Sequence, residues 1–336
     1  MRRTESTMHE RGSRRVLLLH TGGTLGMEGS PLEPGDYAST LDARVPELRA
    51  LAQIETEIVC NLDSSDVGPD EWAELARRID AARDRVDGFV IVHGTDTLAF
   101  TAAALSFALE NVGKPVVLTG AQRPLRALRT DARRNLQDAV ELATRGIPEV
   151  GICFDGLFLR GCRAVKLDAF SYRAFASPGM PPLARMGVDV DVTAHLRRGR
   201  GAYRFDPRFD DRVATVYVHP GVSASGVAAL ARTDVRGVVL AAFGVGTIPT
   251  RDPALGAAIR QLREADIDVL VVTQHGGRVN LGAYRNSATL REAGAISGGS
   301  MRVEAAVPKL MHALAVFDDP DQRRAYIERD VAGEQA

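Results

Sequence analysis

The sequence has few cysteines, and they form no recognisable framework. Cys60, Cys153 and Cys162 are an odd number and lack the spacing of a metal site. The class of disulfide-rich secreted scaffolds is therefore excluded, and no candidate metal centre emerges. We expect a cytoplasmic protein without a metal, in which Cys60 and Cys153 are reduced residues of the core.

An excess of one charge and long apolar runs are also missing. The 42 basic and 43 acidic residues give a net charge of −1, which argues against an electrostatic nucleic-acid surface. No apolar run approaches the roughly 18 residues that a membrane helix needs. The run before the first glycine turn is too short for a signal peptide. We therefore expect neither nucleic acid nor a membrane among the partners.

The 336 residues alternate between short β-branched runs and amphipathic segments, which predicts an α/β fold with parallel sheets. Irregular sequence at 173–212 interrupts this alternation, so we expect an N-terminal domain at 14–190, a linker at 191–212 and a smaller C-terminal domain at 213–330. Strands are expected at 16–20, 54–60, 88–93, 115–119, 149–154, 213–219, 237–243 and 268–274. Helices are expected at 69–84, 97–112, 131–143, 223–232, 253–265 and 302–316.

Two threonine-rich turns follow expected strands directly. Thr21-Gly22-Gly23-Thr24 follows the first apolar run, and His93-Gly94-Thr95-Asp96-Thr97 follows the third strand. Open α/β sheets bind ligands at the carboxyl ends of their strands. The structural alternatives are a plain tight turn for the first segment, and a helix cap by Thr95 or Asp96 for the second.

Two further segments could supply polar groups to the same sheet edge. Asp63-Ser64-Ser65-Asp66 follows the second strand, and its hydroxyl and carboxylate groups suit a ligand that resembles an amino acid. An ordinary capping loop explains it equally well. Lys166 follows the fifth strand; in a neutral form it would be a base for a threonine hydroxyl, although most lysines are solvated surface residues.

Together these residues resemble the bacterial-type L-asparaginases, a family with catalytic threonines. Both family signatures are intact, and the resemblance runs from about Val16 to about residue 325. Four further runs are similar to the cytoplasmic type I branch of the family. They are Leu62-Asp63-Ser64-Ser65-Asp66, Gly113-Lys114-Pro115-Val116, Phe175-Ala176-Ser177-Pro178 and Val279-Asn280-Leu281-Gly282.

The resemblance implies a fold, an activity and an assembly. The family has a larger N-terminal domain with a flavodoxin-like parallel sheet and a smaller C-terminal α/β domain. It hydrolyses L-asparagine to L-aspartate and ammonia, with no metal or organic cofactor. A homodimer or homotetramer is implied, because second-domain residues of one subunit close the neighbour's site.

Catalytic roles follow from the family signatures. Thr24 would be the primary nucleophile, and Tyr37 would orient it or help to deprotonate it. Thr95, Asp96 and Lys166 would form a triad on the opposite side of the substrate. Thr95 would then act on water or as a second nucleophile, according to whether hydrolysis proceeds through an acyl-enzyme or by direct attack of water.

Substrate-binding roles also follow from the resemblance. Asp63, Ser64 and Ser65, together with Thr95 and Asp96, would surround the α-amino and α-carboxylate groups of asparagine. Thr247 stands in the second-domain turn where family members commonly carry asparagine.

Val165 and His275 replace a threonine and a cysteine that form an allosteric site in some type I enzymes. We therefore expect hyperbolic kinetics.

Two other functions are compatible with these motifs. The first is the asparaginase-like subunit of a tRNA-dependent amidotransferase, although that subunit carries an extra N-terminal domain for which we expect no room before Thr21. The second is a catalytically dead amino-acid sensor, although the threonines and the lysine that such a protein would lose are all present.

Overall fold

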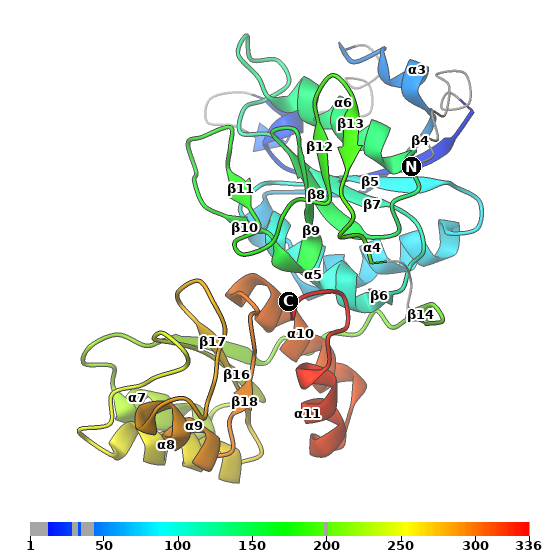
Figure 1. Ribbon diagram of the computed structural model, residues 1–336. Coiled ribbons are helices and arrows are strands. Elements are labelled where there is room, and N and C mark those ends of the chain that lie inside the picture. Colours follow the sequence, from blue (N-terminus) through cyan, green and yellow to red (C-terminus); the bar gives the residue numbers. More distant parts are fainter. Residues whose placement is uncertain (1–12, 29–32, 35–43, 198–200, 336) are drawn as a thin grey trace. The chain divides into compact units, whose positions relative to one another are not determined.

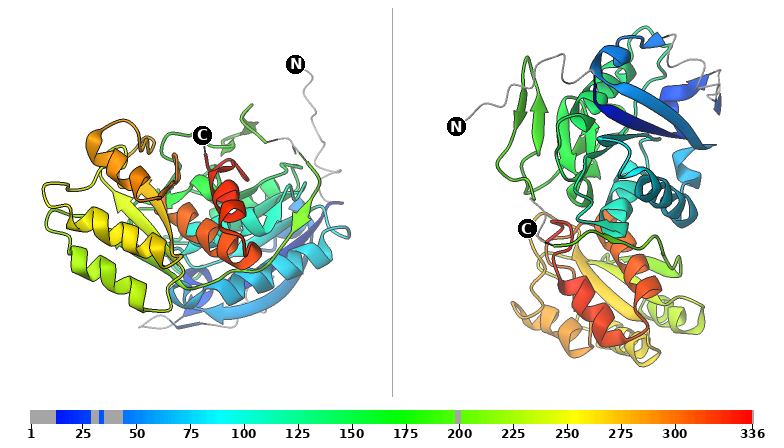
Figure 2. Two further views of the ribbon diagram at one scale, coloured as in Figure 1. Left: turned by 90° about the horizontal axis from the view of Figure 1, so that it is seen from below. Right: turned by 90° about the vertical axis from the view of Figure 1, so that its right-hand side faces the viewer.

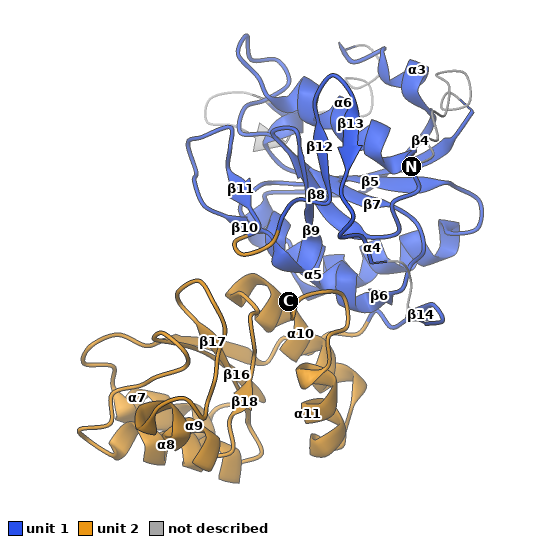
Figure 3. Cartoon of the chain, in the orientation of Figure 1, with its two compact units in different colours: residues 1–177, 181–207 blue, residues 178–180, 208–336 orange. Residues whose placement is uncertain are grey.

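The computed structural model describes residues 13–28, 33–34, 44–197 and 201–335. The chain divides into two compact units (Figure 3). The larger unit holds residues 1–177 and 181–207, and the smaller unit holds residues 178–180 and 208–336.

An eight-stranded sheet forms the centre of the larger unit, in the order β13-β12-β9-β8-β7-β5-β1-β4. Its parallel strands are β1 (Arg15–Gly22), β4 (Gln53–Leu62), β5 (Gly88–Val92), β7 (Val116–Thr119) and β8 (Val150–Phe154). Across the sheet, these five strands follow the order β4-β1-β5-β7-β8. Numbered by their position in the chain, this is the order 2-1-3-4-5, which is flavodoxin-like. The predicted α/β class is therefore confirmed.

Helices cover both faces of this sheet, as Figures 1 and 2 show. One face carries α4 (Pro69–Ala82) and α5 (Leu98–Ala108), and the other carries α3 (Leu48–Leu51) and α6 (Ala132–Ala143). All five residues of β5 are buried, as expected for a strand with helices on both sides. By contrast, β4 is an edge strand, so Cys60 is only partly buried rather than a core residue.

The segment after β8 contains strands that the sequence analysis missed. β9 (Leu157–Arg160) pairs antiparallel with β8, and β12 (Ala184–Met186) and β13 (Val190–Val192) continue the sheet. β14 (Arg204–Phe205) pairs with β6 (Leu109–Glu110), so the larger unit extends into the stretch predicted as a linker. Strands of two or three residues are too short to show a period.

The smaller unit has a four-stranded parallel sheet in simple chain order, which agrees with the expected smaller α/β domain. Its strands are β15 (Val213–Tyr217), β16 (Gly237–Ala242), β17 (Asp268–Thr273) and β18 (Ile296–Ser297). Figure 1 shows α7 (Ala224–Ala229), α8 (Ala254–Glu264) and α9 (Arg285–Glu292) on one face. The other face carries α10 (Val303–Val316) and α11 (Pro320–Glu328).

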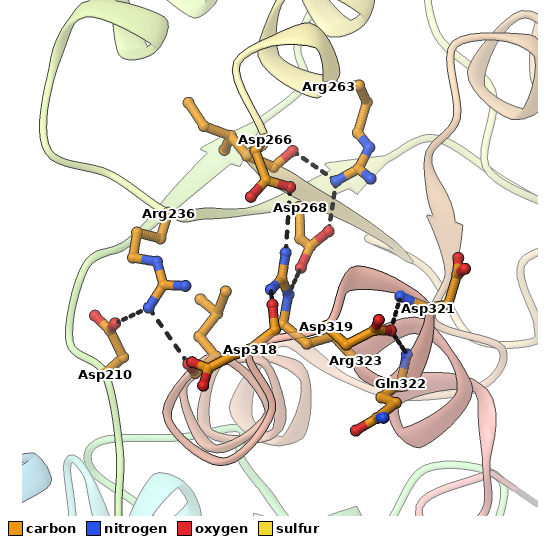
Figure 4. A network of polar contacts seen from close by, with 12 residues as sticks. Asp210, Arg236, Arg263, Asp266, Asp268, Asp318, Asp319, Asp321, Gln322 and Arg323 are labelled. Atoms are coloured by element: carbon orange, nitrogen blue, oxygen red, sulfur yellow. Dashed lines mark hydrogen bonds and ion pairs between the residues drawn. The ribbon is translucent and has the colours of Figure 1, made fainter.

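Two buried ionic clusters join the helices of the smaller unit to its strands and tail. Asp268, at the start of β17, accepts from Arg323 Nε at 2.6 Å and Arg263 Nη1 at 2.5 Å (Figure 4). In α10, Lys309 Nζ pairs with Glu334 Oε1 at 2.5 Å, and both side chains are fully buried. Lys309 also donates to the carbonyls of Ile327 and Arg329.

Candidate active site

The candidate site lies at the point where the strand order of the large sheet reverses. β1 and β5 are neighbours there, although β4 lies between them in the chain. Thr24 follows β1 directly, and Thr95 and Asp96 follow β5. The crossover helices leave such a switch point in opposite directions, which opens a crevice at the carboxyl ends of the strands.

Glycines allow the turns after three strands to touch one another. A Cβ on Gly23 would lie 2.4 Å from the Cα of Gly94, and a Cβ on Gly94 would lie 2.6 Å from the Cβ of Ser64. Thr97 adds a hydrogen bond from its hydroxyl to the carbonyl of Ser64, at 2.6 Å. The two threonine signatures and the serine-rich loop are therefore packed against each other, and larger residues at either glycine would separate them.

Thr95, Asp96 and Lys166 meet in one cluster. Lys166 Nζ donates to Thr95 Oγ1 at 2.7 Å and pairs with Asp96 Oδ1 at 2.5 Å. Lys166 stands on β10 (Val165–Lys166), which pairs with β11 (Phe175–Ala176). Its side chain is only 15% exposed, whereas that of Asp96 is 69% exposed. The lysine is therefore held against a nearly buried hydroxyl, and the carboxylate stays open to solvent.

Neither Thr95 nor Asp96 caps α5, which removes the structural alternative for this segment. The cap position belongs to Thr97, and no side chain caps the helix there. Thr95 instead donates its hydroxyl proton to Gln122 Oε1 at 3.2 Å. Sequence analysis did not single out Gln122, because a lone glutamine in a loop carries no signal.

Asp63 does act as a cap, for the short 3-10 turn Ser64–Asp66. Its Oδ1 accepts from the backbone N–H of Ser65 at 2.8 Å and from the Ser65 hydroxyl at 2.7 Å. These bonds, the backbone bond first, lower the pKa of the Asp63 carboxyl. Ser64 is buried beneath Gly94 and Ser65 is exposed, so the structure places the two serines in different surroundings.

Hydrogen bonds of His93 connect the second threonine turn to α5 and, through Thr101, to α4. Its Nδ1 donates to the carbonyl of Gly94 at 2.7 Å, so its Nε2 accepts from the Thr101 hydroxyl at 2.9 Å. Trp72 Nε1 in turn donates to Thr101 Oγ1 at 3.0 Å. Burial lowers the pKa of His93 to about 4, and the neutral ring satisfies this chain of bonds.

Two of the predicted site residues, Tyr37 and Thr247, are not in the turns and loops described so far. Tyr37 lies outside the described residues. Thr247 belongs to the smaller unit, where its hydroxyl donates to the carbonyl of Phe243 at 3.3 Å in a turn with positive φ at Gly244 and Gly246. Of the residues that the structure describes, no group of three or more His, Cys, Asp or Glu side chains could hold a metal ion. No helix in the described ranges is long and apolar enough to cross a bilayer.

Family comparison agrees with this geometry. Residues 15–198 match the family "Asparaginase, N-terminal", and residues 212–327 match the family "Glutaminase/Asparaginase C-terminal domain". The chain belongs to the asparaginase family. The resemblance predicted from the two threonine signatures is therefore confirmed.

Proteins with similar sequences align along most of their length. L-asparaginase 1 of Escherichia coli K12 is 36% identical over 332 residues, which are 95% of this chain and 97% of the relative. The structure of the thermostable L-asparaginase from Thermococcus kodakarensis superposes with a TM-score of 0.90 at 36% identity, covering 96% of this chain and 99% of that one. A subunit of the glutamyl-tRNA(Gln) amidotransferase of Aeropyrum pernix is 34% identical over 95% of this chain and 79% of the relative.

Proposed function

We propose that this protein is an L-asparaginase, which hydrolyses L-asparagine to L-aspartate and ammonia. The observation that carries the proposal is the contact of Lys166 with Thr95 and Asp96, beside the Thr24 turn at the switch point of the sheet. Amide hydrolysis needs a nucleophile, a base and donors for the oxyanion, and this crevice offers all three without a metal. The full-length similarity to named L-asparaginases supports the same conclusion.

In the mechanism that we propose, Thr24 attacks the side-chain amide carbon of asparagine. A C–O bond forms and the C–N bond breaks, and the proton that the Thr24 hydroxyl loses passes to the leaving nitrogen, which departs as ammonia. Lys166 is the base that we assign to Thr95, and Thr95 in turn takes a proton from the water that hydrolyses the aspartyl ester, whose C–O bond to Thr24 breaks as the Thr24 oxygen regains a proton. Tyr37 would orient Thr24, and the backbone N–H of Thr95 would stabilise the oxyanion.

Substrate recognition is assigned to the acidic groups at the open side of the crevice. Both described hydrogen bonds to Asp63 end on Oδ1, which leaves Oδ2 for the α-ammonium group. Asp96 adds a second, solvent-facing carboxylate. Ser64 and Ser65 are the hydroxyl-bearing residues of the same loop, and we assign them to the α-carboxylate side.

We further propose that the enzyme is cytoplasmic and works as a homodimer or homotetramer, in which Thr247 of one subunit lines its neighbour's site. Leu128 and Phe170 support the assembly, because these large apolar side chains are 102% and 99% exposed on the larger unit. Their loops are joined by a hydrogen bond from the Tyr172 hydroxyl to the Arg129 carbonyl. Activity should track association, so a monomer by light scattering with full activity would contradict this assembly.

Ammonia release tests the activity directly. The wild-type chain is assayed with L-asparagine and L-glutamine, with D-asparagine as the control for stereospecificity. Thr24→Val keeps the shape of the side chain and removes the hydroxyl, so we expect kcat to fall by about 10³-fold or more while the fold is kept. Near-normal turnover by folded Thr24→Val would overturn the role of Thr24, and an inactive wild type would overturn the function.

The amidotransferase relative raises a second candidate, an ammonia-supplying subunit of a larger enzyme. The two functions differ in their need for a partner. Rapid asparagine hydrolysis by the purified chain alone supports the asparaginase. Hydrolysis that appears only with a co-purifying subunit would favour the second candidate.

A further inference from the structure

Asp131 occupies the N-cap position of α6, but its carboxylate does not cap that helix. The side chain turns toward the loop 120–125 instead. There it accepts the backbone N–H of Gln122 at 2.9 Å and 3.1 Å, one bond to each oxygen. It also accepts the backbone N–H of Arg123 at 3.1 Å. The backbone N–H of Ala132 donates to Thr130 Oγ1 instead, so the Asp131 carboxylate can bind the loop rather than the helix.

Asn135, one helical turn later, completes the attachment of this loop. Its amide nitrogen donates to Asp131 Oδ2 at 3.2 Å and to the carbonyl of Gly120 at 3.0 Å. Its amide oxygen accepts the backbone N–H of Asp155 at 3.1 Å. Asn135 is buried, so its bond to the Gly120 carbonyl is shielded from competing water.

The loop that Asp131 holds touches both threonine turns. The carboxamide of Gln122 accepts the Thr95 hydroxyl at 3.2 Å, and its nitrogen donates to the carbonyl of Ser171 at 3.0 Å. Three residues later, the backbone N–H of Leu125 donates to the carbonyl of Leu25, the neighbour of Thr24, at 3.1 Å. One loop therefore contacts both threonine turns.

We propose that Asp131 is a positioning residue for the reaction, which fixes the loop 120–125 so that Gln122 orients the hydroxyl of Thr95. This inference rests on the proposed asparaginase activity. The Thr95 hydroxyl accepts from Lys166 and donates to Gln122, so its oxygen is held between these two partners. A displaced Gln122 would remove one of the two contacts that fix the position of this oxygen.

The test is a double-variant cycle with Asp131→Ala, Gln122→Ala and the combined variant, measured as kcat and KM for L-asparagine. We expect Asp131→Ala to lower kcat about 10- to 100-fold, since a misplacement of about 1 Å has costs of this order. KM should change little, because Asp63 and Asp96 keep their places. The combined variant should be no slower than the slower single variant, because both act through one contact.

A matched control is Asp319→Ala in the smaller unit. Asp319 also occupies an N-cap position, but it does cap its helix, with bonds of 2.9 Å from the N–H groups of Asp321 and Gln322 (Figure 4). Its removal should lower Tm by roughly 2–4 °C and leave kcat unchanged. If Asp131→Ala does not fold, the nearly isosteric Asp131→Asn replaces it in the cycle.

Each outcome decides between the alternatives. A kcat loss that is non-additive with Gln122→Ala supports the inference. An unchanged kcat, or losses that multiply, would overturn it while an active wild type leaves the proposed function intact. A wild type that releases no ammonia would overturn the proposed function, and this inference with it.

Discussion

Each unit of this protein holds one lysine against a carboxylate at 2.5 Å, but in opposite surroundings. Lys309 in the smaller unit is fully buried, pairs with Glu334 and donates hydrogen bonds to two backbone carbonyls. Lys166 in the larger unit donates to a threonine hydroxyl and to a carboxylate that is 69% exposed. A lysine–carboxylate pair therefore holds the C-terminal tail in place in one unit and lies beside a threonine hydroxyl in the other.

The two units also differ in the topology of their sheets. The smaller sheet runs β15-β16-β17-β18 without a reversal, so α7, α8 and α9 cover one face in sequence. The larger sheet reverses its order at β1, and the threonine turns that follow β1 and β5 are packed against each other at this point. Chemistry is expected where the topology opens a crevice, and charges elsewhere are available for structural roles.

The strongest test of this contrast is Lys166→Met. We expect kcat to fall by about 10³-fold, because the threonine loses its base. Stability should change little, since the remaining partner, Asp96, is solvated. Lys166→Arg is the matched control, because a guanidinium keeps the charge but does not act as a base. Near-normal ammonia release by Lys166→Arg would show that no proton passes through this position.

Lys309→Met should have the reverse effect. Removing one partner of a buried ion pair typically costs about 3–5 kcal/mol, because Glu334 stays buried without its counter-charge. Denaturant unfolding measures this loss, and kcat per folded molecule should match the wild type. A stable Lys309→Met protein with reduced kcat would break the contrast between the two lysines.

The units should also differ in the pH range where they lose stability. His93 has a pKa of about 4 in the folded chain because of burial, against an ordinary value of 6.5. Between these values the unfolded chain binds the extra proton, so stability falls as the pH drops from 6.5 to 4. The contribution is on the order of 3 kcal/mol, and His93→Gln should flatten the slope of unfolding free energy against pH in this window.

Asp210 in the smaller unit supplies the comparison. Hydrogen bonds from Arg212, and also from Arg236, lower its pKa from 3.8 to about 2. Its contribution is therefore present above pH 3.8 and is lost as the pH falls toward 2. Asp210→Asn should alter the slope only in that lower window. A change in the slope between pH 6.5 and pH 4 would contradict the assignment.

The smallest effect is expected for an ion pair on the surface of α4. Arg77 and Glu74 lie 3.5 Å apart, with side chains 57% and 40% exposed. Arg77→Ala should change the free energy of unfolding by no more than about 1 kcal/mol, because water screens the pair. A loss as large as that of Lys309→Met would show that burial does not separate these pairs.

Long, periodic elements were predictable from the sequence, and short ones were not. The run Phe89–Val92 and the apolar segment after Thr97 correspond to β5 and α5 within a few residues. β12 and β13 have only three residues each, and their pairing with β9 depends on distant contacts. β9 did leave a signal, since Asp155-Gly156 has positive φ at both residues and is a typical hairpin turn between apolar strands.

The site was predictable as residue types but not as a network. The motifs name Thr95, Asp96 and Lys166, but Lys166 is 70 residues from Asp96 in the chain and only the fold shows their contact. Gln122 and Asp131 gave no local signal, because their importance lies in which backbone groups they bind. For Asp63, the sequence left capping and ligand binding open, and the structure shows the cap.

The pairing of Lys309 with Glu334 also bears on the order in which the chain folds during synthesis. All eight strands of the larger sheet have been synthesised once the chain reaches Val192. The smaller unit buries a lysine whose counter-charge follows it by 25 residues. Domains emerge from the ribosome and fold from the N-terminal side. The larger unit can therefore fold early, whereas the buried ion pair of α10 forms only after Glu334 has been translated.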